Sequence, residues 1–250
     1  MALPLLLAGC ATVPLTGRQQ VLLMSEQEER ALGAQTFRDY LAKATPSRDP
    51  AARGQVTRVG RRIAAVTGRD DFRWDFRVVD EDQVNAFCLP GGKVVVYTGL
   101  LERVDSDDEL AAVLGHEVAH AIARHGAERA SQEMLVGLGM SVAAGLIVAR
   151  SHDSTSAGLI VAALGAGATV GILLPYSRLH ESEADRMGLI YMAMAGYDPR
   201  AALRFWQRMQ AMEGRGATPE FLSTHPADDT RVAAIQAALP EAMARYRPGP

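Results

Sequence analysis

The sequence is poor in cysteine, in aromatic residues and in charge of one sign, and each shortage excludes a class of protein. Its two cysteines, Cys10 and Cys88, are too few for a disulfide framework, and no CxxC pair is present to hold a metal through thiolates. Aromatic residues make up 6% and the formal net charge is −3. A nucleic-acid binder needs a basic surface or an aromatic stacking platform, so we expect no nucleic-acid partner.

The rest of the composition is ordinary for a globular protein. Hydrophobic residues make up 48% of the sequence and charged residues 22%. A chain of 250 residues can bury one well-packed core. We therefore expect a single domain over residues 25–240. An N-terminal segment over residues 1–24, with a signal remnant and an extended stretch, would precede it, and a flexible tail over residues 241–250 would follow it.

The N-terminus contains a short apolar run, Leu3 to Ala8, followed by Gly9 and Cys10. The run is shorter than the roughly 20 apolar residues that span a bilayer, and it looks like the end of a secretory signal. Leu7-Ala8-Gly9-Cys10 resembles a bacterial lipobox, in which the cysteine becomes a lipid-modified first residue. No Lys or Arg precedes the run, so a greasy, disordered N-terminus is the alternative. We expect lipidation at Cys10, a membrane anchor and a location on the periplasmic side of the bacterial envelope.

Hydrophobic periodicity predicts a mainly helical α+β fold. Ser25 and Ser106 each begin a capping box, with a glutamate three residues later. Segments with apolar residues at helical spacing are expected to form helices: 25–41, 56–66, 110–129, 177–195, 199–212 and 228–239. Three further segments are expected to form strands of a small, partly antiparallel sheet: 72–78, 85–89 and 94–97.

The motif His116-Glu117-Val118-Ala119-His120 carries the chemistry. Residues four apart lie on one face of a helix, so His116 and His120 can present two imidazoles to one ion. Glu117 lies about 100° further round the helix, where its carboxylate can reach a metal-bound water. The surrounding helix is apolar nearly all round and hence buried. Burying these three side chains is costly unless a metal pairs them, which argues against two solvated surface histidines.

A catalytic zinc ion usually has three protein ligands and one open position. The strongest candidate for the third is in Glu181-Ser182-Glu183-Ala184-Asp185. Glu181 and Asp185 lie four residues apart, so one can bind the metal while the other supports a ligand histidine. Glu183 points to a different face, and we expect it to be solvated. Without the upstream motif, this segment would be interpreted as an acidic, exposed helix turn.

The remaining histidines are not expected to be ligands. His125 lies off the zinc face, where with Arg124 it would cap the helix end or form a salt bridge. His180 adjoins Glu181 and would point elsewhere, and His152 lies in a polar loop.

The two motifs together, HExxH and Glu181-x-x-Ala184-Asp185, resemble the gluzincin-type family of zinc metallopeptidases that includes HtpX and the CAAX prenyl proteases. Residues 10–18 resemble the mature start of its periplasmic lipoprotein members, the BepA- and LoiP-like branch. Residues 84–92 and 223–226 resemble two further family motifs. The resemblance covers about residues 10–239, nearly the whole chain, although the C-terminal helical repeats of BepA have no counterpart here.

This resemblance implies a zincin-like fold with a small sheet beside the HExxH helix, and one Zn²⁺ per chain. The zinc ligands would be His116, His120 and Glu181, with Asp185 supporting them from behind. Glu117 would be the general base that assists attack by zinc-bound water. His225 would either occupy the fourth zinc position as a latch or act in catalysis by stabilising the oxyanion; a loop histidine facing water is the third alternative.

The resemblance also suggests how a polypeptide substrate would bind. It would add a β-strand to the segment from Lys93 to Thr98, whose apolar centre is Val94, Val95, Val96 and Tyr97. The expected function is a zinc-dependent endopeptidase that cleaves unfolded or misassembled proteins in the bacterial cell envelope.

Two long apolar segments leave an alternative open. Met134 to Ala149 and Ala157 to Leu174 run to 16 and 18 residues, slightly short of a bilayer span. They are rich in Gly and Ala, and no Lys cluster sets an orientation. We favour a helical hairpin over residues 134–174 that packs over the active site as a lid. The alternatives are an integral membrane metallopeptidase with a transmembrane hairpin, and a latched, chaperone-like binding protein.

Overall fold

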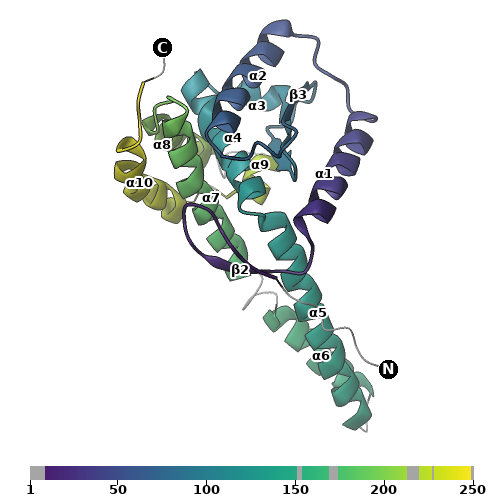
Figure 1. Cartoon of the computed structure of the whole chain (residues 1–250). Helices are drawn as coiled ribbons and strands as arrows, with labels where there is room; N and C mark the ends of the chain where they lie inside the picture. The colour runs from purple at the N-terminus through teal and green to yellow at the C-terminus, as the bar shows by residue number, and fades with distance from the viewer. Residues whose placement is uncertain (1–8, 151–153, 169–173, 213–219, 227, 249–250) are drawn as a thin grey trace.

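The computed structural model describes residues 9–150, 154–168, 174–212, 220–226 and 228–248. Helices dominate these residues, and a small mixed sheet lies beside them (Figure 1), so the mainly helical α+β class is confirmed. The elements in chain order are β1 (Gly9–Thr12), β2 (Gln19–Leu22), α1 (Glu26–Leu41), α2 (Pro50–Ala65), β3 (Asp75–Val79), β4 (Ala86–Leu89), β5 (Lys93–Tyr97), α3 (Thr98–Leu101), α4 (Asp107–Ile122), α5 (His125–Arg150), α6 (Ser154–Ala168), α7 (Leu174–Met194), α8 (Arg200–Met212), α9 (Glu220–Thr224) and α10 (Asp229–Met243).

The three-stranded sheet has the order β3-β5-β4. β3 runs parallel to β5 and β4 runs antiparallel to it, as the predicted partly antiparallel sheet requires. Side chains of β5 alternate between the two faces. Val94 and Val96 join the main core with α2 and α4, whereas Val95 packs with Phe37 of α1 on the other face. The sheet is therefore covered by helices on both faces, and β5 is its buried middle strand.

Two glycines bring α4 and α7 into backbone contact. A Cβ atom on Gly115 would lie 2.8 Å from the carbonyl oxygen of Gly188, and one on Gly188 would lie 2.8 Å from the backbone nitrogen of His116. Any side chain at either position would push the two helices apart. This close approach places the HExxH segment of α4 directly opposite the acidic segment of α7.

The helix predicted over residues 110–129 is in fact two helices. α4 ends at Ile122, and α5 begins at His125. Between them Arg124 adopts a left-handed backbone conformation, with φ 59°. Its side chain is held there by the carboxylate of Glu29 and by the carbonyl of Met24, at 3.0 Å. These contacts come from the N-terminal region and hold Arg124 at the break between the two helices.

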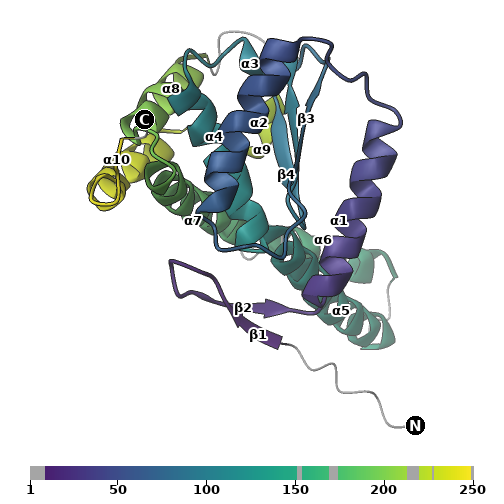
Figure 2. The ribbon, with the colours of Figure 1, turned by 45° about the horizontal axis from the view of Figure 1, so that its top comes forward.

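α5 and α6 pack against each other and project from the rest of the molecule (Figures 1 and 2). Their large apolar side chains are exposed: Met134, Leu135, Leu138, Val142, Leu146, Val148, Leu159, Ile160 and Leu164. Within the described parts of the chain, α5 is the one helix long and apolar enough to cross a membrane. The expected lid, packed over the active site, is not the arrangement that these residues adopt. Residues 169–173 of the predicted segment lie outside the described chain.

The N-terminal segment folds back as a hairpin and docks onto the domain, although an extended stretch was expected. β1 and β2 pair antiparallel, and β2 packs against α5 (Figure 2). Val13 is fully buried. The tight turn between the strands is closed by two backbone hydrogen bonds, from Gly17 to Val13 at 3.0 Å and from Val13 to Arg18 at 2.8 Å. Gly17 has φ 73°, a value that glycine adopts without strain.

Most other helix boundaries lie close to the predicted ones. Ser25 caps α1 through a complete capping box. The last helix, predicted to end at residue 239, continues past Pro240 to Met243. Ala242 is fully buried, so tertiary packing stabilises the turn after the proline.

Candidate metal centre

Four side chains from three parts of the chain converge on one point. They are His116 and His120 from α4, Glu181 from α7, and His225 just after α9, and one ligand atom of each lies within 4.8 Å of the others. The Nε2 atoms of His116 and His120 are 3.0 Å apart, and each lies 3.3 Å from an oxygen of Glu181. The structure therefore brings together the three residues predicted as metal ligands.

His225 belongs to the same group. Its Nδ1 lies 2.7 Å from Glu181 Oε2 and 3.1 Å from His116 Nε2. The short helix α9 holds it there: Phe221 donates its backbone N–H to the carbonyl of Val84, and His225 donates its own to Phe221. The alternative of a loop histidine that faces water is thus wrong, because the imidazole points into the ligand group.

Glu117 lies beside this group and is buried. Its Oε1 lies 3.6 Å from His225 Nε2, and this buried atom has no hydrogen-bond partner among the described residues. Burial raises the pKa of Glu117, although the nearby histidines oppose the shift. A buried oxygen without a donor is costly. It fits a site that takes up a metal ion and a reacting water, and two imidazoles with a carboxylate form a donor set suited to such an ion.

Asp185 supports His116 from behind. Its Oδ1 lies 2.9 Å from His116 Nδ1, which leaves Nε2 facing the other ligands. Arg231 of α10 binds the same carboxylate with two hydrogen bonds of 2.9 and 2.8 Å, and its guanidinium lies over the ring of Trp206. Burial raises the pKa of Asp185, but Arg231 and His116 together hold it below the ordinary value. Arg231 was not predicted; the available signal was an arginine near the start of an otherwise apolar helix.

The electrostatics of the two ligand histidines differ. Burial lowers the pKa of His116, but hydrogen bonds with Asp185 and Glu181 outweigh it and raise the value to about 9. In the metal-free protein, a metal ion therefore has to displace a proton from this ring. Burial lowers the pKa of His120 well below its ordinary value, so this ring is ready to bind as a neutral imidazole. Burial raises the pKa of Glu181, but the three histidines outweigh it and lower the value.

The prediction for Glu183 is wrong: it was expected to be solvated, and it is buried. His125 lies at a helix end, outside the ligand group and paired with a carboxylate, as expected, but it is buried. His125 Nδ1 lies 2.9 Å from His120 Nδ1, and its Nε2 lies 3.0 Å from Glu183 Oε2. The left-handed turn at Arg124 brings His125 back against His120. Burial lowers the pKa of His125 to about 4, although its hydrogen bond with Glu183 opposes the shift.

His180 is not in the ligand group. It is buried, and its Nε2 lies 2.9 Å from Glu128 Oε2. His152 lies outside the described residues.

The strand predicted to bind substrate cannot do so. Val94, Val95, Val96 and Tyr97 belong to β5, which pairs with β3 on one side and with β4 on the other. An added strand needs a free edge, and β5 has none. The order of strands is a long-range property that the local pattern does not contain. The strand that lies at an edge and packs against α4 is β4.

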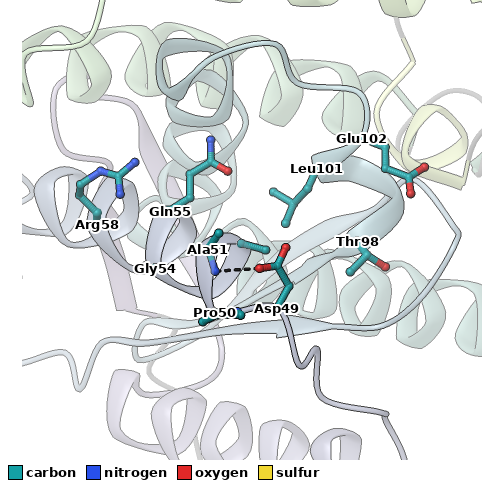
Figure 3. Close-up of a pocket in the computed structure, with 10 residues that line it drawn as sticks. Asp49, Pro50, Ala51, Gly54, Gln55, Arg58, Thr98, Leu101 and Glu102 are labelled. Atoms are coloured by element: carbon teal, nitrogen blue, oxygen red, sulfur yellow. Dashed lines mark hydrogen bonds between the residues drawn. The ribbon is translucent and has the colours of Figure 1, made fainter.

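A separate hollow of about 700 Å³ lies at the start of α2 and contains none of the predicted ligands (Figure 3). Asp49 caps α2 there by accepting a hydrogen bond from the backbone of Ala51. Gln55 and Arg58 on its wall bind Asp107 of α4, at 3.0 and 2.7 Å. These polar groups are engaged in holding α2 against α4, so the metal centre remains the candidate site for chemistry.

The geometry agrees with comparisons to known proteins. Residues 50–239 match the sequence profile of peptidase family M48. The mitochondrial metalloendopeptidase OMA1 of Schizosaccharomyces pombe is 37% identical over 238 residues, which cover 93% of this chain and 67% of that protein. Human OMA1 is 32% identical, with 92% of this chain and 46% of that protein covered. The β-barrel assembly-enhancing protease of Yersinia pestis is 32% identical, with 88% and 46% covered.

The ranking of these relatives corrects one expectation. The predicted branch, the β-barrel assembly-enhancing proteases, is more distant here than the OMA1 protein of S. pombe. The chain also spans less than half the length of the human and Yersinia relatives.

Proposed function

This chain belongs to peptidase family M48 and is a metalloendopeptidase, and from that premise we propose that it uses one zinc ion to cleave unfolded or misassembled polypeptides in a bacterial cell envelope. The observation that carries the proposal is the convergence of His116, His120 and Glu181 beside the buried carboxylate of Glu117. Two imidazoles and one carboxylate are a donor set typical of catalytic zinc in peptidases.

The chain's own residues supply the proton transfers. When bound, zinc would polarise the scissile carbonyl and make a water molecule more acidic. Glu117 accepts the proton of the attacking water and later delivers it to the leaving amine. Its burial favours this role, because a raised pKa brings a carboxylate closer to the working pH of a general base. Asp185 keeps His116 oriented with Nε2 toward the metal.

His225 has two candidate roles at the same place. Its Nδ1 lies 2.7 Å from Glu181 Oε2, within the ligand group, which supports a latch that fills the fourth metal position. A latch has to swing out before a substrate carbonyl can bind. After such a movement the same imidazole could instead donate to the oxyanion that forms on the substrate. Substitution of His225 separates the two roles, since loss of a latch raises activity and loss of an oxyanion donor lowers it.

We assign substrate binding to the free edge of β4 in place of β5. β4 pairs with β5 along one edge, and no other strand pairs with it in the described chain. It packs against α4. Cys88, in β4, lies close enough to Glu117 for the two groups to interact: burial is the main cause that raises the pKa of this thiol, and the charge of Glu117 raises it further. A polypeptide added to β4 would bind through its main chain, which suits unfolded substrates of varied sequence.

The proposed location is based on two features that lie near each other: the exposed Cys10 and the exposed apolar side chains of α5 and α6. Cys10 is exposed at the start of β1, and β2 packs against α5, where Leu23 donates its backbone N–H to Ser131 at 2.9 Å. The exposed apolar side chains of α5 and α6 lie further along the same hairpin. We propose that a lipid on Cys10 and the apolar part of the hairpin, from residue 134 onward, both contact a membrane, with the domain on the periplasmic side. The exposure of the hairpin favours the integral membrane alternative over a lid.

The test of the activity is a casein digestion with the wild-type chain, Glu117→Gln and His225→Ala, with zinc measured in each preparation. We expect the wild type and both variants to contain zinc and Glu117→Gln to lose cleavage. Wild-type cleavage by Glu117→Gln would overturn the mechanism. A chaperone-like protein would be supported instead if the wild type contained no zinc and bound casein without cleaving it, and if the His225→Ala variant behaved in the same way.

Membrane contact is tested by flotation with vesicles of bacterial lipids. A chain with Cys10→Ser is compared with the same chain carrying Leu138→Glu and Val142→Glu, which place charges on the exposed face of α5. We expect the first to float and the second to float less. If both proteins remained to the same extent in the lipid-free bottom fraction, insertion of the hairpin would be contradicted.

A further inference from the structure

Two side chains of the N-terminal turn, Thr16 and Arg18, bind two buried carboxylates of the domain. Arg18 donates two hydrogen bonds to Glu128, at 2.7 and 2.6 Å, and a third from its Nε to Glu183 Oε2 at 2.8 Å. Thr16 donates its hydroxyl to the other oxygen of Glu183. The side chains of Glu128 and Glu183 are 3% and 4% exposed, so Arg18 is the cation that makes their burial tolerable.

From Glu183 a continuous chain of hydrogen bonds leads to a predicted metal ligand. Glu183 Oε2 lies 3.0 Å from His125 Nε2, and His125 Nδ1 lies 2.9 Å from His120 Nδ1. The far side of His120, its Nε2, faces the ligand group at 3.0 Å from His116 Nε2. Three contacts therefore connect the N-terminal turn with His120, a predicted metal ligand.

The chemistry of each link fixes the next one. A neutral His120 that offers Nε2 to a metal must carry its proton on Nδ1, and that N–H needs an acceptor. His125 Nδ1 is this acceptor, so His125 carries its own proton on Nε2 and donates it to Glu183. Glu183 must then be a carboxylate, which Arg18 and Thr16 ensure. A carboxylate that orients a ligand histidine strengthens metal binding. Here the carboxylate of Glu183 orients His120 through an additional imidazole, that of His125.

A second set of contacts holds His125, the middle residue of this series of hydrogen bonds. His180 stacks on His125, with ring centres 4.3 Å apart and planes inclined by 13°. His180 Nε2 is bound by Glu128 at 2.9 Å, and Glu128 is held in turn by Arg18. Arg18 therefore holds both stacked imidazoles in place indirectly: it binds Glu183, which binds His125, and Glu128, which binds His180.

We propose that Thr16 and Arg18 are positioning residues of the metal centre, which orient His120 through Glu183 and His125. The turn that carries them is itself rigid, since two backbone hydrogen bonds close it and the buried Val13 anchors it. The inference rests on the proposed zinc site. It goes beyond that site by making the N-terminal hairpin part of the metal-binding apparatus, although it contributes no ligand.

The test measures metal binding and not activity. Zinc affinity is determined by competition with a chromogenic chelator, and the visible absorption of the cobalt-substituted protein reports ligand geometry. The variants of the full chain are Arg18→Gln, Arg18→Lys and Thr16→Val. Arg208→Gln is the matched control, because it removes an equally close arginine pair to a buried glutamate, Glu109, at the opposite end of α4.

We expect Arg18→Gln to weaken zinc binding by roughly 10- to 100-fold, the usual effect of losing an outer hydrogen bond at a metal site, and to alter the cobalt spectrum. Arg18→Lys keeps one of the two carboxylate contacts and should lie between this variant and the wild type. Thr16→Val should cause a smaller loss of affinity. Arg208→Gln should keep the wild-type affinity and spectrum even if its melting temperature falls.

Wild-type zinc affinity and an unchanged cobalt spectrum in Arg18→Gln would overturn the inference. So would an equal loss of affinity in Arg208→Gln, since that would reflect general destabilisation. If Arg18→Gln does not fold by circular dichroism, Thr16→Val decides, because it removes one hydroxyl and keeps the charge balance. Failure of the wild type itself to bind zinc would instead refute the proposed zinc site.

Discussion

Asp185 Oδ1 lies 2.9 Å from Nδ1 of His116, on the side of the ring opposite the other metal ligands. Replacing Asp185 by Asn keeps the shape but removes the charge that Arg231 and His116 share. We expect Asp185→Asn to lower zinc affinity and peptidase activity by roughly 10- to 100-fold. Chelator competition and casein digestion measure the two effects. A variant with wild-type values in both assays would show that this carboxylate does not support the ligand.

The contact between α4 and α7 makes a packing prediction. Gly188→Ala would place a Cβ 2.8 Å from the backbone nitrogen of His116, so the helices must separate. We expect a loss of about 1–3 kcal/mol in the free energy of unfolding, together with weaker zinc binding. Gly54→Ala in α2 is the control, since no atom lies within 4 Å of the added methyl group. It should stabilise by about 0.5–1 kcal/mol. Equal denaturant midpoints for the two variants would contradict the close approach.

Removal of the metal should abolish cleavage and lower stability together. The site gathers four potential ligands that repel or compete for protons without an ion, so the ion stabilises the folded state in proportion to its affinity. Dialysis against a chelator should eliminate casein digestion and lower the melting temperature, and added zinc should restore both. Full activity in protein verified to be metal-free would exclude a metallopeptidase mechanism.

The buried carboxylate of Glu128 predicts a loss of stability in acid. Burial raises its pKa, but hydrogen bonds from Arg18 and His180 outweigh it and lower the value from 4.5 to about 2. Because the folded pKa lies below the unfolded one, this group stabilises the fold above about pH 4.5 and loses its contribution as the pH falls toward 2. The free energy of unfolding of the metal-free protein should therefore fall less steeply with acid in Glu128→Gln. An identical slope in the wild type would contradict the assignment.

The parts of the site that the sequence predicts are those set by local periodicity. His116 and His120 share a face because both lie on one helix at a spacing of four, and Glu181 and Asp185 follow the same rule. The middle position of β5 was not predictable, because strand order depends on partners far along the chain. Neither was the burial of Glu183, whose partner Arg18 is 165 residues away in sequence.

The break between α4 and α5 shows a different limit. Arg124 is not a glycine, and nothing in the local sequence favours a left-handed conformation there. Its contacts with Glu29 and Met24 come from another part of the chain, so the continuous apolar pattern by itself predicts one helix.

The burial of α5 divides this helix into two parts. Its buried residues, His125, Ala127, Glu128 and Ser131, all lie in the first two turns, whereas the large apolar side chains from Met134 onward are exposed. α5 has 26 residues, so it is about 39 Å long at about 1.5 Å per residue. One helix therefore serves two environments: its first two turns are packed in the domain that holds the metal centre, and the remainder presents an apolar surface outside it.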